Sequence, residues 1–184
     1  MDNTQLCIES YSRHKNLKLV GMELGIPWQS VYSTLRKADY PVTGDKARYG
    51  SVTDRIAVIG EQRFKKAVPI ARDNNDLKYQ ADIDFTIENI TIDVKTSRIR
   101  RKQQGKGIKN AAPRWGYYIN KQKDTADFFV LYALDDNNET EHVFLMPNEI
   151  VTTVSMISIP ETLASKWADY KIEEGELLSF FQSL

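Results

Sequence analysis

Apolar and polar residues alternate in two adjacent segments near the middle of the chain, residues 81–87 and 90–95. Because successive side chains of a strand point to opposite faces, this period of two predicts a β-hairpin with one apolar and one charged face. If residues 88 and 89 form a two-residue turn, residue 87 pairs with 90, 85 with 92, 84 with 93 and 82 with 95. The charged face would then carry Asp82, Asp84, Asp93 and Lys95.

A period of three to four residues marks two segments nearer the N-terminus. Leu17, Val20 and Leu24 recur at helical spacing, and Gly25 follows them, where a helix end favours a left-handed residue. A second helix is predicted to begin near Pro27, because its first turn does not need the N–H that proline lacks. Pro41 is expected to end that helix.

Two short helices joined by a glycine-containing turn have helix-turn-helix spacing. The segment 17–42 resembles helix-turn-helix DNA-binding domains, in which the second helix enters the major groove. A helical hairpin that only packs against the rest of the chain is the alternative. The resemblance implies that DNA is contacted by exposed residues of the second helix, namely Trp28, Gln29, Ser30, Ser33, Arg36 and Lys37.

The remaining pattern predicts one larger domain after a short polar linker at residues 43–51. Its expected elements are a helix at 52–68, the hairpin, a buried strand at 126–134, a neighbouring strand at 141–147 and a final helix at 173–184. The predicted organisation is therefore a small all-α domain, residues 1–45, followed by an α/β or α+β domain, residues 46–184.

Composition narrows the function classes only slightly. Lys+Arg and Asp+Glu both number 25, so the whole chain has no net charge. Cys7 is the only cysteine, and His14 and His142 are far apart, which argues against disulfides and a Cys/His zinc site. No apolar run approaches the roughly 18 residues of a membrane span, and the first residues lack a signal pattern. A cytoplasmic protein without a membrane partner is the expectation.

The carboxylates of the hairpin carry the candidate chemistry. In the predicted register Asp84 and Asp93 face each other, and like charges in that position destabilise a sheet. A Mg²⁺ ion between them would reverse the sign, since it prefers carboxylate oxygens. A longer turn would slide the register and could bring Asp82 into the place of Asp84. The alternative to a site is a solvated strand face.

The stretch ADIDFTIENITIDVK resembles the core of the PD-(D/E)XK nuclease superfamily, in which an acidic residue, a hairpin and (D/E)-x-K follow one another. Here these residues are Asp84 or Asp82, then Asp93, Val94 and Lys95. The family often has a glutamate on the preceding helix, which would be Glu61. The resemblance covers roughly residues 50–147 and implies a restriction-endonuclease-like mixed sheet flanked by helices.

The resemblance also implies roles for these residues in hydrolysing phosphodiester bonds. Asp84, Asp93 and the Val94 carbonyl would hold Mg²⁺, which Mn²⁺ is expected to replace, with Asp82 as a neighbouring ligand. Glu61 would complete the metal sphere directly or through water. Lys95 would orient or deprotonate the attacking water, or stabilise the transition state.

Ten Lys or Arg residues and no acidic residue lie between positions 95 and 123, with three aromatic residues interleaved. Such local asymmetry predicts a polyanion-binding segment, although a solubilising loop is the alternative. The predicted DNA contacts in it are Arg98, Arg100, Arg101, Lys102, Lys106 and Lys109.

Together these patterns favour a Mg²⁺-dependent, sequence-directed DNA endonuclease that acts as a homodimer on double-stranded DNA. The alternatives are a structure-specific junction resolvase and a non-catalytic DNA-binding regulator with a nuclease-like fold.

Overall fold

The computed structural model describes residues 2–78, 81–101 and 112–184, and these divide into two compact units. The first unit lies within residues 1–50 and 74–81, and the second within residues 51–73 and 82–184. The sequence had suggested a single boundary after residue 45. Residues 46–50 and the segment from Asn74, which begins with a short 3-10 helix (Asn74–Asp76), instead belong to the first unit.

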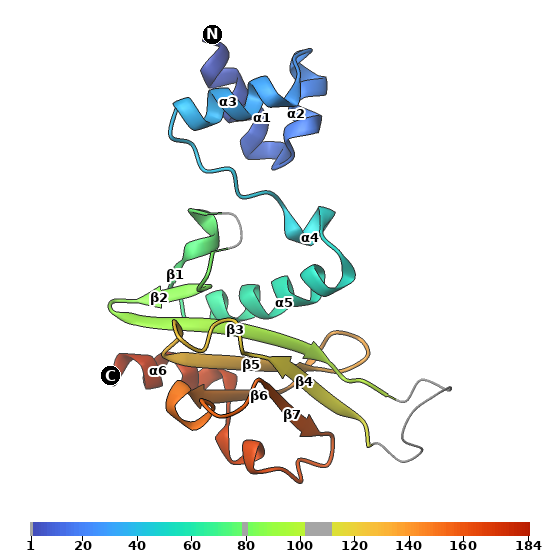
Figure 1. Ribbon diagram of the computed structural model, residues 1–184, viewed down its shortest axis with the longest axis vertical. Helices are drawn as coiled ribbons and strands as arrows, with labels where there is room; N and C mark the ends of the chain where they lie inside the picture. Colours follow the sequence, from blue (N-terminus) through green and yellow to red (C-terminus); the bar gives the residue numbers. More distant parts are fainter. Residues whose placement is uncertain (1, 79–80, 102–111) are drawn as a thin grey trace. The chain divides into compact units, whose positions relative to one another are not determined.

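Three helices form the core of the first unit: α1 (Asn3–His14), α2 (Leu17–Leu24) and α3 (Trp28–Lys37) (Figure 1). The helices α2 and α3 confirm the two predicted helices, whereas α1 was not predicted. Their shared apolar core consists of Cys7, Tyr11, Val20, Val31 and Leu35. A short helix, α4 (Lys46–Tyr49), follows them.

The turn between α2 and α3 is tight because two glycines permit it. Gly25 caps α2 in the left-handed conformation, with φ 66°, as the sequence predicted. A Cβ on Gly21 would lie 2.6 Å from the Ile26 carbonyl oxygen, so only glycine lets the chain after α2 approach this closely.

The helix α3 ends at Lys37, so the prediction that Pro41 ends it was wrong. Asp39 adopts a left-handed conformation, with φ 54°, and turns the chain before the proline is reached. The Tyr40 N–H then donates to the Leu35 carbonyl at 2.9 Å, which satisfies one of the carbonyls left unbonded at the helix end.

The second unit is a mixed α+β structure built on a six-stranded sheet in the order β1-β2-β3-β5-β6-β8. The pair β3 and β5 is parallel and the other neighbours are antiparallel. The strands are β1 (Arg72–Asp73), β2 (Phe85–Ile87), β3 (Ile90–Arg98), β5 (Phe128–Leu134), β6 (Thr140–Pro147) and β8 (Lys171–Ile172). The predicted strands at 126–134 and 141–147 correspond to β5 and β6.

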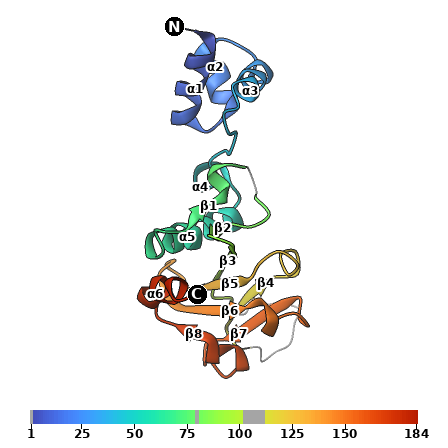
Figure 2. The ribbon, with the colours of Figure 1, turned by 90° about the vertical axis from the view of Figure 1, so that its left-hand side faces the viewer.

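Two helices cover one face of this sheet, α5 (Val52–Ala67) and α6 (Leu177–Gln182) (Figure 2). Ser51 and Asp54 form a capping box that fixes the start of α5. Phe64 on α5 contacts Phe181 on α6, with ring centroids 6.0 Å apart. The final helix is shorter than predicted, since a 3-10 turn (Glu174–Glu176) precedes α6.

A two-stranded antiparallel sheet covers the opposite face, formed by β4 (Arg114–Tyr118) and β7 (Met156–Pro160). Two further 3-10 helices, Asn148–Ile150 and Lys166–Tyr170, lie on either side of β7 along the chain. Neither strand was predicted. Trp115 and Tyr117, two of the aromatic residues interleaved with the basic ones, are buried and are core residues. Tyr118 is exposed.

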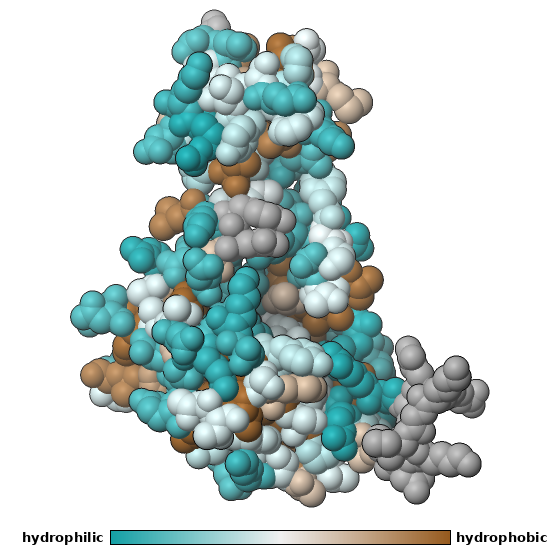
Figure 3. Space-filling view, in the orientation of Figure 1, coloured by the Kyte–Doolittle hydropathy of each residue, from teal (hydrophilic) through white to brown (hydrophobic). Residues whose placement is uncertain are grey.

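No helix within residues 2–78, 81–101 and 112–184 has both the length and the apolar character needed to cross a membrane. On the face shown in Figure 3, apolar residues are scattered among hydrophilic ones.

Candidate active site

The hairpin has the predicted turn but a shorter first strand. Ile87 pairs with Ile90 and Phe85 with Ile92, so the two-residue turn and its register are confirmed. However, β2 begins only at Phe85, and residues 82–84 form a bend before it. The predicted strand pairs of Asp84 with Asp93 and Asp82 with Lys95 are therefore wrong.

Core packing explains this departure. Phe85 and Ile87 pack with α5 and α6 on one face of the sheet, whereas Ile83 packs against the cluster on the other face. In a continuous strand Ile83 would lie on the same face as Phe85. The chain must leave strand geometry between these two residues to bury both.

Asp84 nevertheless stays beside β3. Its Oδ2 accepts a hydrogen bond from the Val94 N–H at 2.9 Å, which takes the place of the backbone of the departing β2 strand. Because the N–H and C=O of one strand residue point to the same side, the Val94 carbonyl faces the edge where Asp84 lies. The bend therefore brings a carboxylate and a carbonyl oxygen to the same edge of β3.

Asp93 lies on β3 with only 2% of its surface exposed. Its neighbours Ile92 and Val94 face the core under α5, so strand alternation directs Asp93 to the opposite face. Burial, together with the negative charge of Asp84, raises the pKa of Asp93 from an ordinary 3.8 to about 7. The positive charges of Lys95 and Lys121 oppose that shift.

Lys95 is two residues along the same strand and therefore on the same face. Its Nζ lies 2.6 Å from Oδ2 of Asp93, and 23% of its side chain is exposed. The ammonium group thus connects a buried carboxylate to the surface. The sequence predicted this pair of residues on one face, and the structure adds that the carboxylate is buried.

Lys121 is a site residue that the sequence did not single out. It is exposed in the turn after β4, and its charge contributes to the pKa of Asp93. The only signal for Lys121 itself was its membership of the basic segment.

Glu61 lies on α5, one residue after Gly60, which packs directly against Thr96 on β3. The helix covers the face opposite to Asp93. A ligand role for Glu61 would require its carboxylate to reach the edge of β3 near Asp84 from the α5 side. Asp82 belongs to the bend and is exposed.

Three oxygen donors beside β3 could hold a hard cation that keeps most of its water. Within the described parts of the chain, no group of three or more His, Cys, Asp or Glu residues could hold a metal ion. The oxygen donors beside β3 are two carboxylates, Asp84 and Asp93, and the Val94 carbonyl. Mg²⁺ is commonly bound by one or two carboxylates and several waters, so this set fits Mg²⁺ better than a fully protein-liganded ion.

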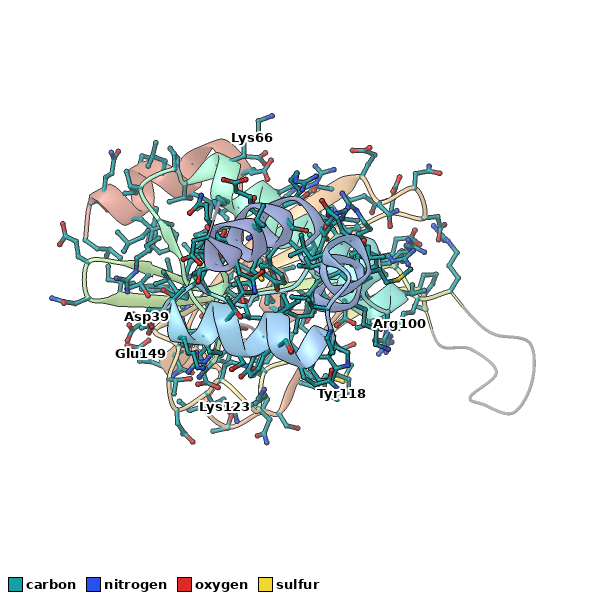
Figure 4. All side chains as sticks on the ribbon, turned by 90° about the horizontal axis from the view of Figure 1, so that it is seen from above. Asp39, Lys66, Arg100, Tyr118, Lys123 and Glu149 are labelled. Carbon is teal, nitrogen blue, oxygen red and sulfur yellow. The ribbon has the colours of Figure 1, made fainter. Side chains whose placement is uncertain are left out.

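The predicted DNA-contacting basic residues have different environments. Arg98 donates from Nε to Asn138 at 2.9 Å, and Arg101 forms ion pairs with Asp136 and Glu161 at 2.9 and 3.2 Å. Arg100 is exposed, and it lies well apart from Lys123 in Figure 4. Lys102, Lys106 and Lys109 are outside the described residues. Of the predicted contacts that the structure describes, Arg98 and Arg101 therefore have protein partners for their guanidinium groups.

The predicted contact residues of the first unit share one surface. Val31 and Leu35 are buried on the inner side of α3. The outer side presents Trp28, Gln29, Ser30, Ser33, Arg36 and Lys37, all exposed.

The sequence matches no protein-family model, and no curated protein matches it.

Proposed function

We propose that the chain is a Mg²⁺-dependent DNA endonuclease of the PD-(D/E)XK type, with the first unit binding double-stranded DNA. The observation that carries the proposal is the environment of Asp93. A buried carboxylate with a pKa near 7 has a neighbouring carboxylate, Asp84, and an ammonium group, Lys95, 2.6 Å away. Strongly shifted pKa values of this kind are concentrated at functional sites.

A structural ion pair alone would not account for the second carboxylate. Burying Asp93 next to Asp84 costs free energy, because both carry the same charge. A divalent cation between them would convert that repulsion into binding energy. The arrangement therefore supports a cation site formed by Asp84, Asp93 and the Val94 carbonyl.

The chemistry divides among these groups. A bound Mg²⁺ ion supplies positive charge for the phosphate and for activation of a water molecule. Asp93 and Asp84 would hold the ion, and Asp93 would do so from a buried position. The Lys95 Nζ lies on the partly exposed side of the site, where it can donate a hydrogen bond to the attacking water or to a phosphate oxygen.

The order of elements supports the restriction-endonuclease-like version of the fold. A helix precedes the hairpin, the (D/E)-x-K residues lie on its second strand, and that strand pairs in parallel with the buried strand β5. Cutting both strands with one site per chain is most simply achieved by a homodimer.

A non-catalytic DNA-binding regulator is the second candidate, because the exposed polar side of α3 supports DNA binding without cleavage. Incubation with supercoiled plasmid in Mg²⁺, Mn²⁺ or EDTA separates the two. We expect nicked or linear products with either ion and none in EDTA. Asp93→Asn should abolish them, and Asp169→Asn, which removes an exposed carboxylate on a 3-10 helix, should not.

Cleavage that persists in Asp93→Asn would refute the assigned site. Absence of cleavage on plasmid, linear duplex and branched DNA would favour the regulator.

A further inference from the structure

The exposed side of α3 is made of two parallel rows of residues. Side chains four positions apart are neighbours on a helix surface. One row is therefore Trp28, Tyr32 and Arg36, and the other is Gln29, Ser33 and Lys37. Each row begins with residues that can contact bases and ends with a cation.

The aromatic row is exposed although the helix has a separate apolar side. Trp28 and Tyr32 keep 42% and 44% of their surface exposed, while Val31 and Leu35 are fully buried. Two neighbouring aromatic side chains in water are unfavourable unless a partner covers them. Both side chains lie outside the buried core of the unit, so they are available to a partner.

Charge indicates which partner this is. The sequence of α3, WQSVYSTLRK, contains two cations and no carboxylate. The nearest acidic residue along the chain, Asp39, lies beyond the end of the helix (Figure 4). A helix with this composition is complementary to a polyanion, and the major groove of DNA is wide enough to admit it.

The side chains at the start of α3 also indicate which bases are read. In helix-turn-helix complexes the N-terminal residues of the second helix contact base edges. Gln29 can donate to and accept from adenine at once, and aromatic carbon contacts the methyl group of thymine. Guanine is usually read by Arg or Lys, and cytosine by Asp or Glu, which are missing from the first eight residues of α3.

We infer that α3 reads A·T base pairs in the major groove, with Gln29 on adenine and Trp28 and Tyr32 on thymine methyl groups. Arg36 and Lys37 contact the flanking phosphates. The inference rests on the proposed DNA-binding function and specifies its substrate. On this inference, the first two turns of α3 give the preference for particular bases, and its last turn gives affinity for DNA of any sequence.

The test uses the full chain carrying Asp93→Asn, so that DNA is bound without being cut. Selection from a random duplex library should enrich a site with consecutive A·T pairs. Gln29→Ala should then reduce the preference for adenine at one position by about 10-fold, the usual discrimination of one bidentate contact. Circular dichroism checks that each variant remains folded.

Replacing thymine by uracil removes only the methyl group and so isolates the aromatic contact. Uracil at the contacted position should weaken binding of the parent protein several-fold. In Tyr32→Ala the same replacement should have no effect, because the methyl group has lost its partner. Tyr49→Ala serves as the control, since Tyr49 is similarly exposed, at 45%, but lies on α4.

The outcomes are distinguishable. A selected site of G·C pairs, or binding without any preference, would overturn the inference and leave DNA binding intact. Absence of binding to every duplex would refute the proposed function itself. If Tyr32→Ala changes the oligomeric state of the protein but not its DNA affinity, the aromatic row is a protein interface and the inference is wrong.

Discussion

Asp93 has an environment in which the charged form of its side chain is disfavoured. A carboxyl group whose pKa is higher in the folded chain binds its proton more tightly there than when unfolded. The free energy of unfolding should therefore fall as the pH rises from 3.8 to about 7. Over this range the contribution of Asp93 to the free energy of unfolding would fall by about 4 kcal/mol, at 1.36 kcal/mol per pKa unit.

This gives a prediction for Asp93→Asn, whose side chain cannot ionise. In EDTA, the difference in free energy of unfolding between pH 4 and pH 8 should shrink by most of that amount relative to the parent. Urea denaturation at the two pH values measures it, with Asp169→Asn as the exposed control. If the free energy of unfolding of Asp93→Asn depends on pH as that of the parent does, burial does not raise the pKa of this carboxyl.

The proposed roles of Lys95 in cleavage and of the two carboxylates in Mg²⁺ binding can be tested separately. At pH 8, Mg²⁺ at a hundred times its Kd should stabilise the parent by about 2.7 kcal/mol, and Asp84→Asn should lose this effect. Lys95→Met should keep the stabilisation, because it leaves both carboxylates in place, but should lose cleavage by about 100-fold or more. Thermal melts with and without Mg²⁺, together with plasmid cleavage, measure the two effects.

Loss of Mg²⁺ stabilisation in Lys95→Met would contradict this division of roles, as would cleavage at the parental rate.

At the scale of elements, the contact between α5 and β3 holds the site strand against the core. A Cβ on Gly60 would overlap Oγ1 of Thr96 and lie 3.3 Å from the Tyr132 ring. Since Thr96 is one residue from Lys95, the close approach of the helix also fixes the strand that carries the site.

Gly60→Ala should therefore destabilise the protein by about 1–3 kcal/mol, the usual cost of overpacking a core. Thr96→Ala in the same chain should recover part of this loss, because it removes the overlapping oxygen. Chemical denaturation of the single and double variants measures the coupling. Gly175→Ala is the matched control, since its added Cβ would meet nothing within 4 Å.

Equal stability of Gly60→Ala and the parent would mean that α5 and β3 are not in such close contact.

Most elements with a strong local signal were predicted, whereas two strands that pair only with each other were not. The helices α2, α3 and α5 have regular apolar periods, and the hairpin has a two-residue turn that sets its own register. The strands β4 and β7 are short and pair with each other across a long stretch of chain, so neither has a nearby partner that would reveal it.

At the scale of the whole molecule, net charge is zero and binding of DNA would depend on where cations are available. Arg36 and Lys37 are exposed at the end of α3, whereas Arg101 is already paired with Asp136 and Glu161. We therefore expect the exposed pair, Arg36 and Lys37, to contribute more than Arg101 to the dependence of DNA affinity on salt.

The double variant Arg36→Ala and Lys37→Ala should reduce the slope of log affinity against log salt by roughly 1.8, or about 0.9 for each lost phosphate contact. Arg101→Ala should change the slope less, because its guanidinium is engaged by carboxylates. Fluorescence anisotropy with one duplex over a salt series measures both slopes. A larger change for Arg101→Ala would place the main phosphate contacts in the second unit.

The sequence by itself determined which residues share the charged face of the hairpin and much of their scaffold. The alternation in the hairpin placed Asp93 and Lys95 on one face, and the turn set the pairing of Phe85 with Ile92. Both follow from the geometry of a single strand and its nearest neighbour, which local order along the chain specifies.

Only the tertiary structure decided how the carboxylates of Asp84 and Asp93 come to lie beside the same strand. Ile83 and Phe85 are buried on opposite faces of the sheet, so the chain bends between them and Asp84 reaches the Val94 N–H in place of a partner strand. Asp93 is buried because β5 pairs alongside β3 and the second face of the sheet is covered. Burial depends on contacts between residues distant in sequence, and these set the pKa of Asp93, which no local pattern encodes.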